Sequence, residues 1–213
     1  TVLRVIAEDP ITPAEAIIKV KAAYFPVTAL TERLSQIDTN PNILNNSYVG
    51  TLTMTPSGEV KYVPTSDEPI RKYGVNNNTK GAIEIFQMPE KNLKGEIPVG
   101  RYIIGHDPCD NDQAESSSLS STFVLDLFTD TIVAEYTGRH DYAEDNYEIC
   151  RLLCLFYNAK CMYESNKKGL FAYFSKMNCT HLLADTPEYL RDKQLIKYSS
   201  FGSGAKGINA SAA

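Results

Sequence analysis

The chain has 213 residues, of which 43% are hydrophobic, and a formal net charge of −5. These values are typical of an ordinary soluble globular protein, long enough for one large domain or for one domain with an arm. No apolar run approaches the roughly 18 residues that a membrane span needs. The N-terminus also lacks the features of a secretory signal peptide, so we expect neither a membrane protein nor a secreted one.

Charged side chains are unevenly distributed along the chain. Residues 105 to 150 carry 11 acidic and 1 basic side chains, whereas residues 151 to 213 carry 4 acidic and 9 basic ones. Such a split is typical of a cation site beside a polyanion-binding face. A solvated surface of mixed charge explains it equally well.

Cysteine usage favours a reducing compartment. The five cysteines are odd in number and lie mostly inside apolar patterns, which favours free thiols over disulfides. A zinc site built from His106, Cys109 and the cysteines near residue 150 is not expected, because no CxxC or HxxxH spacing supports it. The five are Cys109, Cys150, Cys154, Cys161 and Cys179.

The first part of the chain, residues 1 to 38, is predicted to be a helical arm. One helix begins near Thr12, which has the character of an N-cap, with Pro13 at the first helical position. A second helix covers residues 29 to 37, whose apolar residues lie on one helical face.

Residues 39 to 98 change to β character. The runs 48–54 and 59–63 alternate around a Pro-Ser-Gly turn and predict a hairpin, and residues 82–87 predict a further strand. This region contains no catalytic signature. We expect a small accessory sheet that packs against the main domain.

Residues 99 to 213 have the pattern βββ-α-β-α-β, which is the order of an RNase H-like α/β domain. In that fold the first three strands are antiparallel, the fourth runs beside the first, and helices cover both faces of the mixed sheet. The predicted elements are strands 101–106, 122–128 and 131–136, helix 141–157, strand 160–163, helix 167–177, strand 181–184 and a last helical piece that begins at Thr186.

Two acidic residues end strands that this order makes neighbours. Asp107 closes the first strand ahead of Pro108, and Glu164 closes the fourth. Parallel neighbours would present both carboxylates at one edge of the sheet, where the sites of α/β proteins lie. Two close carboxylates suit Mg²⁺, and two such ions can hydrolyse a phosphodiester. Each acid alone is equally explained as a turn or strand-end residue.

Other polar residues near these strand ends have simpler interpretations. Asp110 and Asp112 are interpreted as solvated loop acids, and His106 as a structural residue that faces away from Asp107. The stretch 202–207 is not a Walker A loop, because that motif requires a lysine directly after its second glycine, and here Ile208 follows. Five lysines could contact DNA phosphates without sequence preference or form a solvated face. They are Lys167, Lys168, Lys193, Lys197 and Lys206.

Four stretches occur in an order that characterises one protein family. They are Gly105-His106-Asp107-Pro108, Ala134 to Arg139, Tyr163-Glu164-Ser165-Asn166 and Thr186-Pro187. This ordered set resembles the C-terminal nuclease domain of the large terminase subunit of tailed bacteriophages. Upstream, Glu8 to Ala16 is similar to the segment that links the packaging ATPase to that nuclease.

The resemblance implies an RNase H-like endonuclease that cuts concatemeric viral double-stranded DNA during genome packaging, using two Mg²⁺ or Mn²⁺ ions. It makes Asp107 and Glu164 the catalytic metal ligands. The family's third acid follows a Gly-Lys-Gly loop that resembles 204–207. No acid follows Lys206 in this sequence, which leaves Asp185 as a substitute ligand.

The same resemblance implies a domain organisation and partners. Residues 1–38 would link a missing ATPase domain to a nuclease domain at 39–213, with an accessory β region at 39–98. The catalytic core at 99–213 would be truncated at its C-terminus. The implied partners are double-stranded DNA, the ATPase domain of the same polypeptide, the portal and the small terminase subunit, in the host bacterial cytoplasm.

Two other functions remain open from the sequence. A RuvC-type resolvase or transposase nuclease shares this fold and metal chemistry but prefers branched or end-specific DNA. A non-catalytic RNase H-like module would dock on the packaging motor through its arm and accessory strands. The two acids favour the enzymes, and the missing third acid favours the docking module.

Overall fold

The computed structural model describes residues 26–40, 47–70, 79–110, 118–188 and 206–208 of the chain. The chain divides into two compact units after Asn46. In the first unit, the helix α3 (Val27–Thr39) has no buried residues, and Leu30 and Leu34 of its predicted apolar face are exposed. The predicted helix near Thr12 lies outside the described residues.

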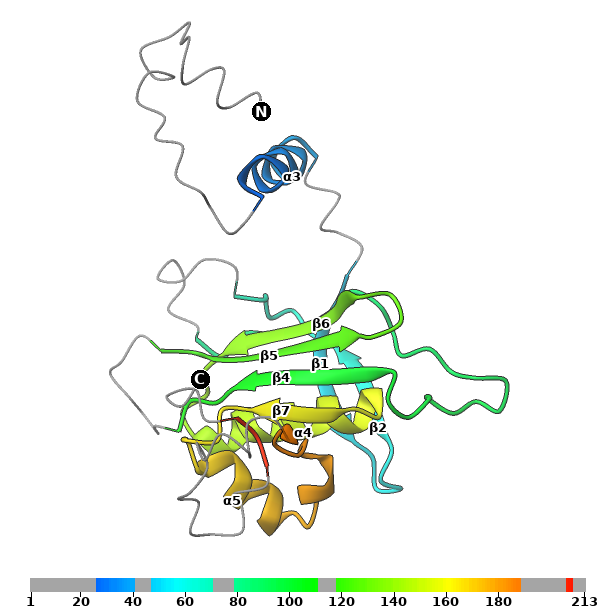
Figure 1. The fold of residues 1–213 in the computed structure, drawn as a ribbon, viewed down its shortest axis with the longest axis vertical. Helices are drawn as coiled ribbons and strands as arrows, with labels where there is room; N and C mark the ends of the chain where they lie inside the picture. The colour runs from blue at the N-terminus through cyan, green and yellow to red at the C-terminus, as the bar shows by residue number, and fades with distance from the viewer. Residues whose placement is uncertain (1–25, 41–46, 71–78, 111–117, 189–205, 209–213) are drawn as a thin grey trace, which may run out of the picture. The chain divides into compact units, whose positions relative to one another are not determined.

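The second unit is a mixed α/β structure built on one seven-stranded sheet with the strand order β2-β1-β3-β6-β5-β4-β7. Figure 1 shows this sheet face on. Its strands are β1 (Tyr48–Met54), β2 (Val60–Pro64), β3 (Ile83–Ile85), β4 (Tyr102–Asp107), β5 (Ser120–Asp126), β6 (Thr131–Gly138) and β7 (Lys160–Tyr163).

Strands β4, β5 and β6 form the predicted antiparallel meander, and β7 runs parallel to β4. Buried and more exposed positions alternate along β4, so that Ile104 is buried while Gly105 is exposed. This period of two is what a strand with one covered face requires. The prediction that the fourth strand of this region lies beside the first is confirmed.

The strands of the accessory region belong to the main sheet. β1 and β2 form the predicted hairpin, and β3 joins it to β6 through the antiparallel pairs Glu84 with Glu135 and Ile85 with Ala134. The prediction of a separate small sheet that packs against the main domain was therefore wrong. β3 pairs with β1 on one side and with β6 on the other, so the hairpin extends the sheet beyond β6.

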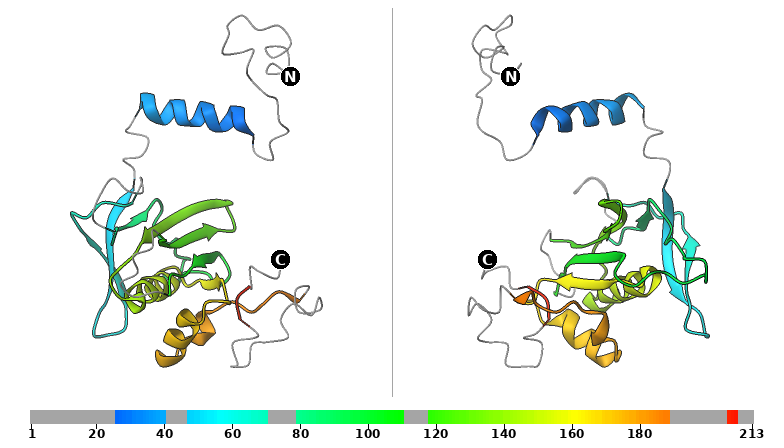
Figure 2. Two further views of the ribbon diagram at one scale, coloured as in Figure 1. Left: turned by 90° about the vertical axis from the view of Figure 1, so that its left-hand side faces the viewer. Right: turned by 45° about the vertical axis from the view of Figure 1, so that its right-hand side comes forward.

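Two helices pack on one side of this sheet. α4 (Ala143–Tyr157) covers one face, and α5 (Gly169–Lys176) packs beside it near the β7 edge (Figure 2). Both contribute residues to a single core. On the opposite face, Phe123 and Ile132 are 40% and 43% exposed, and no described helix of this unit covers them. The expectation of helices on both faces is not met within the described part of the chain.

The predicted last strand, 181–184, is reduced to a single bridge. Residues Thr180–Leu182 form a 3₁₀ turn, and only Leu183 pairs with Cys161 of β7, in the parallel direction. The reason lies further along β7, where Ile208 takes the outer edge by pairing with Glu164. Two short segments therefore share the edge that one full strand would fill.

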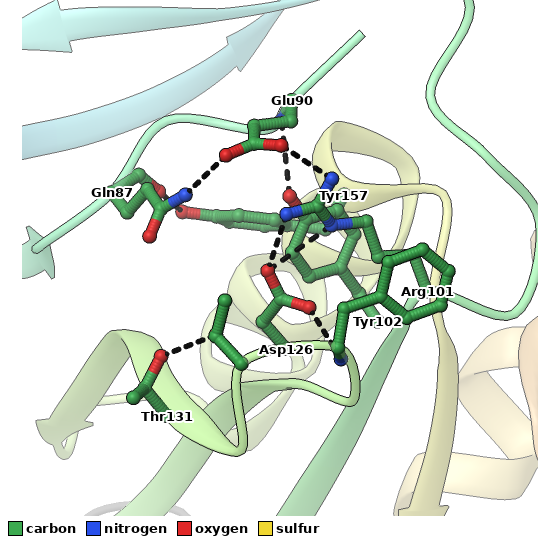
Figure 3. Close-up of polar contacts among 9 residues, drawn as sticks. Gln87, Glu90, Arg101, Tyr102, Asp126, Thr131 and Tyr157 are labelled. Atoms are coloured by element: carbon green, nitrogen blue, oxygen red, sulfur yellow. Dashed lines mark hydrogen bonds and ion pairs between the residues drawn. The ribbon is translucent and has the colours of Figure 1, made fainter. Parts of the chain in front are cut away.

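A buried ion pair joins β4 and β5 at the end of the sheet opposite to Asp107. Arg101 donates from Nε and Nη2 to Oδ2 of Asp126 at 3.1 and 2.8 Å, and Nη1 also bonds Glu90. Asp126 is fully buried, and its other oxygen accepts the backbone N–H of Phe128 at 2.9 Å. Figure 3 shows this network together with Tyr102 and Tyr157. This network holds the register of the strand that carries Asp107.

Candidate active site at the end of strands β4 and β7

The parallel pairing of β4 with β7 brings the two predicted acids to one edge of the sheet. His106 is the register partner of Tyr163, so the next residues, Asp107 and Glu164, leave the sheet together. The backbone N–H of Glu164 also donates to the carbonyl of His106 at 3.3 Å. The position of both acids was thus predicted correctly from their places at strand ends.

A lysine connects the two carboxylates. Nζ of Lys167 lies 2.8 Å from Oδ1 of Asp107 and 3.3 Å from Oε2 of Glu164. Partial burial opposes the charged form of Lys167, but hydrogen bonds and charge from both acids outweigh it and raise its pKa. Since both oxygens contact one cationic nitrogen, the two carboxylates converge on a single position.

The surrounding contacts fix this arrangement from two sides. Asn166 donates from Nδ2 to Oε1 of Glu164 at 2.9 Å, which leaves Oε2 directed toward Lys167. Lys167 also donates to the carbonyl of Pro108 at 2.7 Å. The side chain of Glu164 is 24% exposed and that of Asp107 is 61% exposed, so the pair opens to solvent on the Asp107 side.

A segment from far along the chain completes this edge. The N–H of Ile208 donates to the carbonyl of Tyr163 at 2.8 Å, and Ile208 accepts from the N–H of Ser165 at the same distance. On its other side, Gly207 donates to the carbonyl of Ala184 at 3.1 Å. Residues 206–208 therefore lie between β7 and the segment after Leu183, next to Glu164.

Gly207 is required for this close approach. Its φ is +75°, and a Cβ would lie 2.7 Å from the carbonyl oxygen of Tyr163. We expect Gly207→Ala to lower the free energy of unfolding by about 1 to 2 kcal/mol from the left-handed backbone alone, and further because of the clash with backbone.

Gly95→Ala is the matched control, since Gly95 has a φ of +79° with nothing within 4 Å of the added Cβ. Urea unfolding of both variants measures the difference. Equal losses at the two positions would contradict a tight fit of Gly207 against β7.

The structure does not bring Asp185 into the acid pair. Asp185 is 57% exposed, and Nζ of Lys206 binds its Oδ1 at 2.7 Å and the carbonyl of Leu183 at 3.0 Å. Within the described part of the chain, no three carboxylates or histidines converge at this edge. The prediction of Asp185 as a third ligand is therefore not supported, because the strand-like segment 206–208 stands between it and Glu164.

The predicted DNA-binding lysines have different roles. Lys167 and Lys206 each neutralise acids at this edge, which the sequence analysis did not foresee. Lys168 is exposed beside them. Lys193 and Lys197 lie outside the described residues. Glu164 and Lys167 are three residues apart in a turn rather than on a helix, so their spacing alone does not indicate the ion pair.

Two neighbours of the site are structural. His106 is buried on the opposite face from Asp107, as predicted, and its Nδ1 lies 2.8 Å from Oγ1 of Thr122. Burial lowers the pKa of His106 to about 4, so the ring is neutral at pH 7. Asp110 was interpreted as a solvated acid, but it accepts the hydroxyl of Tyr147 at 2.6 Å and the N–H of Gly169 at 3.0 Å. It therefore anchors the start of α5.

The fold and this edge define a mixed α/β protein with a convergent acid pair at the carboxyl ends of two parallel strands. A comparison with protein-family models, curated proteins and solved structures finds no match to this chain. No helix in the described ranges is both long and apolar enough to cross a bilayer.

Proposed function

We propose that this chain is a metal-dependent DNA endonuclease of the RNase H-like type, the nuclease domain of a viral packaging terminase. The observation that carries the proposal is the convergence of Asp107 and Glu164 on one cationic group, the ammonium of Lys167. Carboxylates that converge on a cation at the carboxyl edge of parallel strands are suited to hold a divalent metal ion there.

The strand arrangement supports the same proposal. The order β6-β5-β4-β7, with β4 central and β7 parallel to it, is the order expected for the first four strands of an RNase H-like sheet. The bridge of Leu183 to Cys161 marks the place of the fifth strand. The hairpin β1–β2 and strand β3 are additions to that arrangement.

The residues present fit a hard divalent cation. Mg²⁺ binds carboxylate oxygens and keeps several waters, so Asp107 and Glu164 would hold one ion between them and leave it open to a phosphate. Such ions supply Lewis-acid chemistry for the hydrolysis of a phosphodiester.

Two neighbouring side chains hold the acids in position to bind an ion. Asn166 orients the carboxylate of Glu164, and Lys167 holds the two carboxylates together. A divalent ion held by the two acids would take the place of the ammonium of Lys167. Lys167 and exposed Lys168 would then contact DNA phosphates.

The proposed partners follow from this reaction. The substrate is double-stranded DNA, which the lysines contact through phosphates and therefore without base recognition. As a packaging nuclease, the chain would act with an ATPase domain of the same polypeptide, the portal and the small terminase subunit, in the cytoplasm of the bacterial host.

A second candidate function is a non-catalytic docking module of the packaging motor. It is favoured by the pairing of Lys206 with Asp185, which leaves two acids at this edge among the residues that the structure describes. It predicts binding to the motor without cleavage of any DNA.

Cleavage of supercoiled plasmid tests these functions. With Mg²⁺ or Mn²⁺ we expect nicked and then linear DNA, and with a chelator no product. A four-way junction of equal length, cut in preference to linear duplex, would indicate the resolvase type instead. Metal-independent cleavage, or none of either substrate in any metal, would exclude the proposed nuclease.

A further inference from the structure

Three cysteines meet inside the core at a distance from the acid pair along β7. Cys150 and Cys154 are four residues apart on α4, so they lie on the same helical face. This face packs against β7, where Cys161 is buried (Figure 1). The three Sγ atoms lie within 4.8 Å of one another, and those of Cys150 and Cys161 are 3.6 Å apart.

The spacing of these sulfurs is that of a coordination shell. A cation about 2.3 Å from three coplanar sulfurs would hold them about 4 Å apart. The three thiols therefore need only small side-chain adjustments to share an ion. Within the described part of the chain, no other cysteine, histidine or carboxylate joins this group.

The number and kind of donors select the ion. Thiolates are soft ligands that favour Cu(I) and Zn²⁺ over hard cations. Structural zinc sites take four ligands, whereas here three sulfurs converge in an apolar core. All three cysteines have 0% exposure, so bulk solvent does not reach the sulfurs. This set suits a three-coordinate, monovalent, thiophilic ion.

An ion that binds here would displace the protons of the thiols, because cysteine binds metal ions as the thiolate.

We propose that Cys150, Cys154 and Cys161 form a three-sulfur binding site for Cu(I). The site joins α4 to β7, the strand that ends at Glu164. It is independent of the proposed nuclease activity. Because the cysteines are fully enclosed, the ion enters as the chain folds and is then retained.

Anaerobic refolding with Cu(I) tests the site. The reduced protein is unfolded in urea, refolded with one equivalent of Cu(I), and separated from free ion in the presence of a competing Cu(I) chelator. We expect one retained ion per chain, an ultraviolet thiolate-to-copper charge-transfer band and a raised Tm. Wild-type protein that refolds but retains no copper would overturn the proposal.

Cysteine variants locate the ion. Cys154→Ala should lose the retained copper and the band, whereas Cys109→Ala and Cys179→Ala, which replace buried cysteines outside the cluster, should keep both. Circular dichroism of each variant without copper shows whether it folds. If Cys154→Ala does not fold, Cys161→Ala makes the same comparison. Zn²⁺ retained in place of Cu(I), with loss in the Cys179 variant, would indicate a four-sulfur zinc site and contradict the proposal.

Discussion

Asp107→Asn and Glu164→Gln should each lower the rate of Mg²⁺-dependent plasmid cleavage by about a thousandfold or more, because each would remove a charged ligand from an ion that the proposed reaction requires. The neutral amides keep the size of the carboxyl groups, so the fold is retained. Initial rates of nicking on agarose gels measure the effect. Asp130→Asn is the matched control, since it makes the same change in the β5–β6 turn at the other end of the sheet.

Lys167→Met separates metal binding from simple charge pairing at this edge. If the acids serve only to pair with Lys167, Lys167→Met should lower the rate of plasmid cleavage as much as the substitution of either acid does. If they bind metal, Lys167→Met removes a competing cation, and calorimetry should show Mn²⁺ bound about two- to fivefold more tightly, as expected for a partly exposed pair. Cleavage that persists in both acid variants would refute the site.

Asp126→Ala should be the most destabilising substitution in the sheet, with a fall in Tm of about 6 to 12 °C. It leaves the guanidinium of Arg101 buried without its main partner and frees the N–H of Phe128. Thermal unfolding followed by circular dichroism measures the effect. Asp141→Ala is the control, because Asp141 is 70% exposed and pairs with Lys80 at only 3.5 Å.

The same ion pair predicts a pH dependence of stability. Hydrogen bonds from Arg101 hold the pKa of Asp126 below its usual range. As pH falls below about 4 the unfolded chain takes up this proton before the folded protein does. The Tm difference between wild type and Asp126→Asn should therefore be constant above about pH 4 and shrink below it. A difference that persists unchanged at pH 3 would contradict a charged Asp126 as its source.

Local sequence signals were sufficient to predict most of the helices and strands, but not every pairing between strands. Alternation and β-branched residues predicted β4 to β7 closely, and strand order followed from a known arrangement. The joining of β3 to β6 could not be predicted, since it places Glu84 opposite Glu135. Like charges across a ladder are unfavourable, and only the fold reveals that Glu84 is buried and bonded to Ser47.

In the candidate site, too, some features could be predicted from the sequence and others could not. Asp107 and Glu164 were predictable because each ends a strand, and strand ends of a parallel pair meet. The pairing of Lys206 with Asp185 was not, because it depends on where a segment about 20 residues later returns to the sheet. The cysteine cluster combines a helix spacing of four residues with a strand position, a pattern that no short metal motif describes.

Because Ile208 comes late in the chain, the strand edge that it pairs with is completed late during synthesis. Ile208 follows Glu164 by 44 residues (208 − 164) and supplies the backbone partner of β7 at Tyr163 and Ser165. At about 5 to 20 residues per second, a ribosome needs about 2 to 9 s to make that stretch. During this interval the newly made sheet carries an open strand edge next to its two acids. Of the sheet that the structure describes, the edge with the two acids is thus the part that a nascent chain completes last.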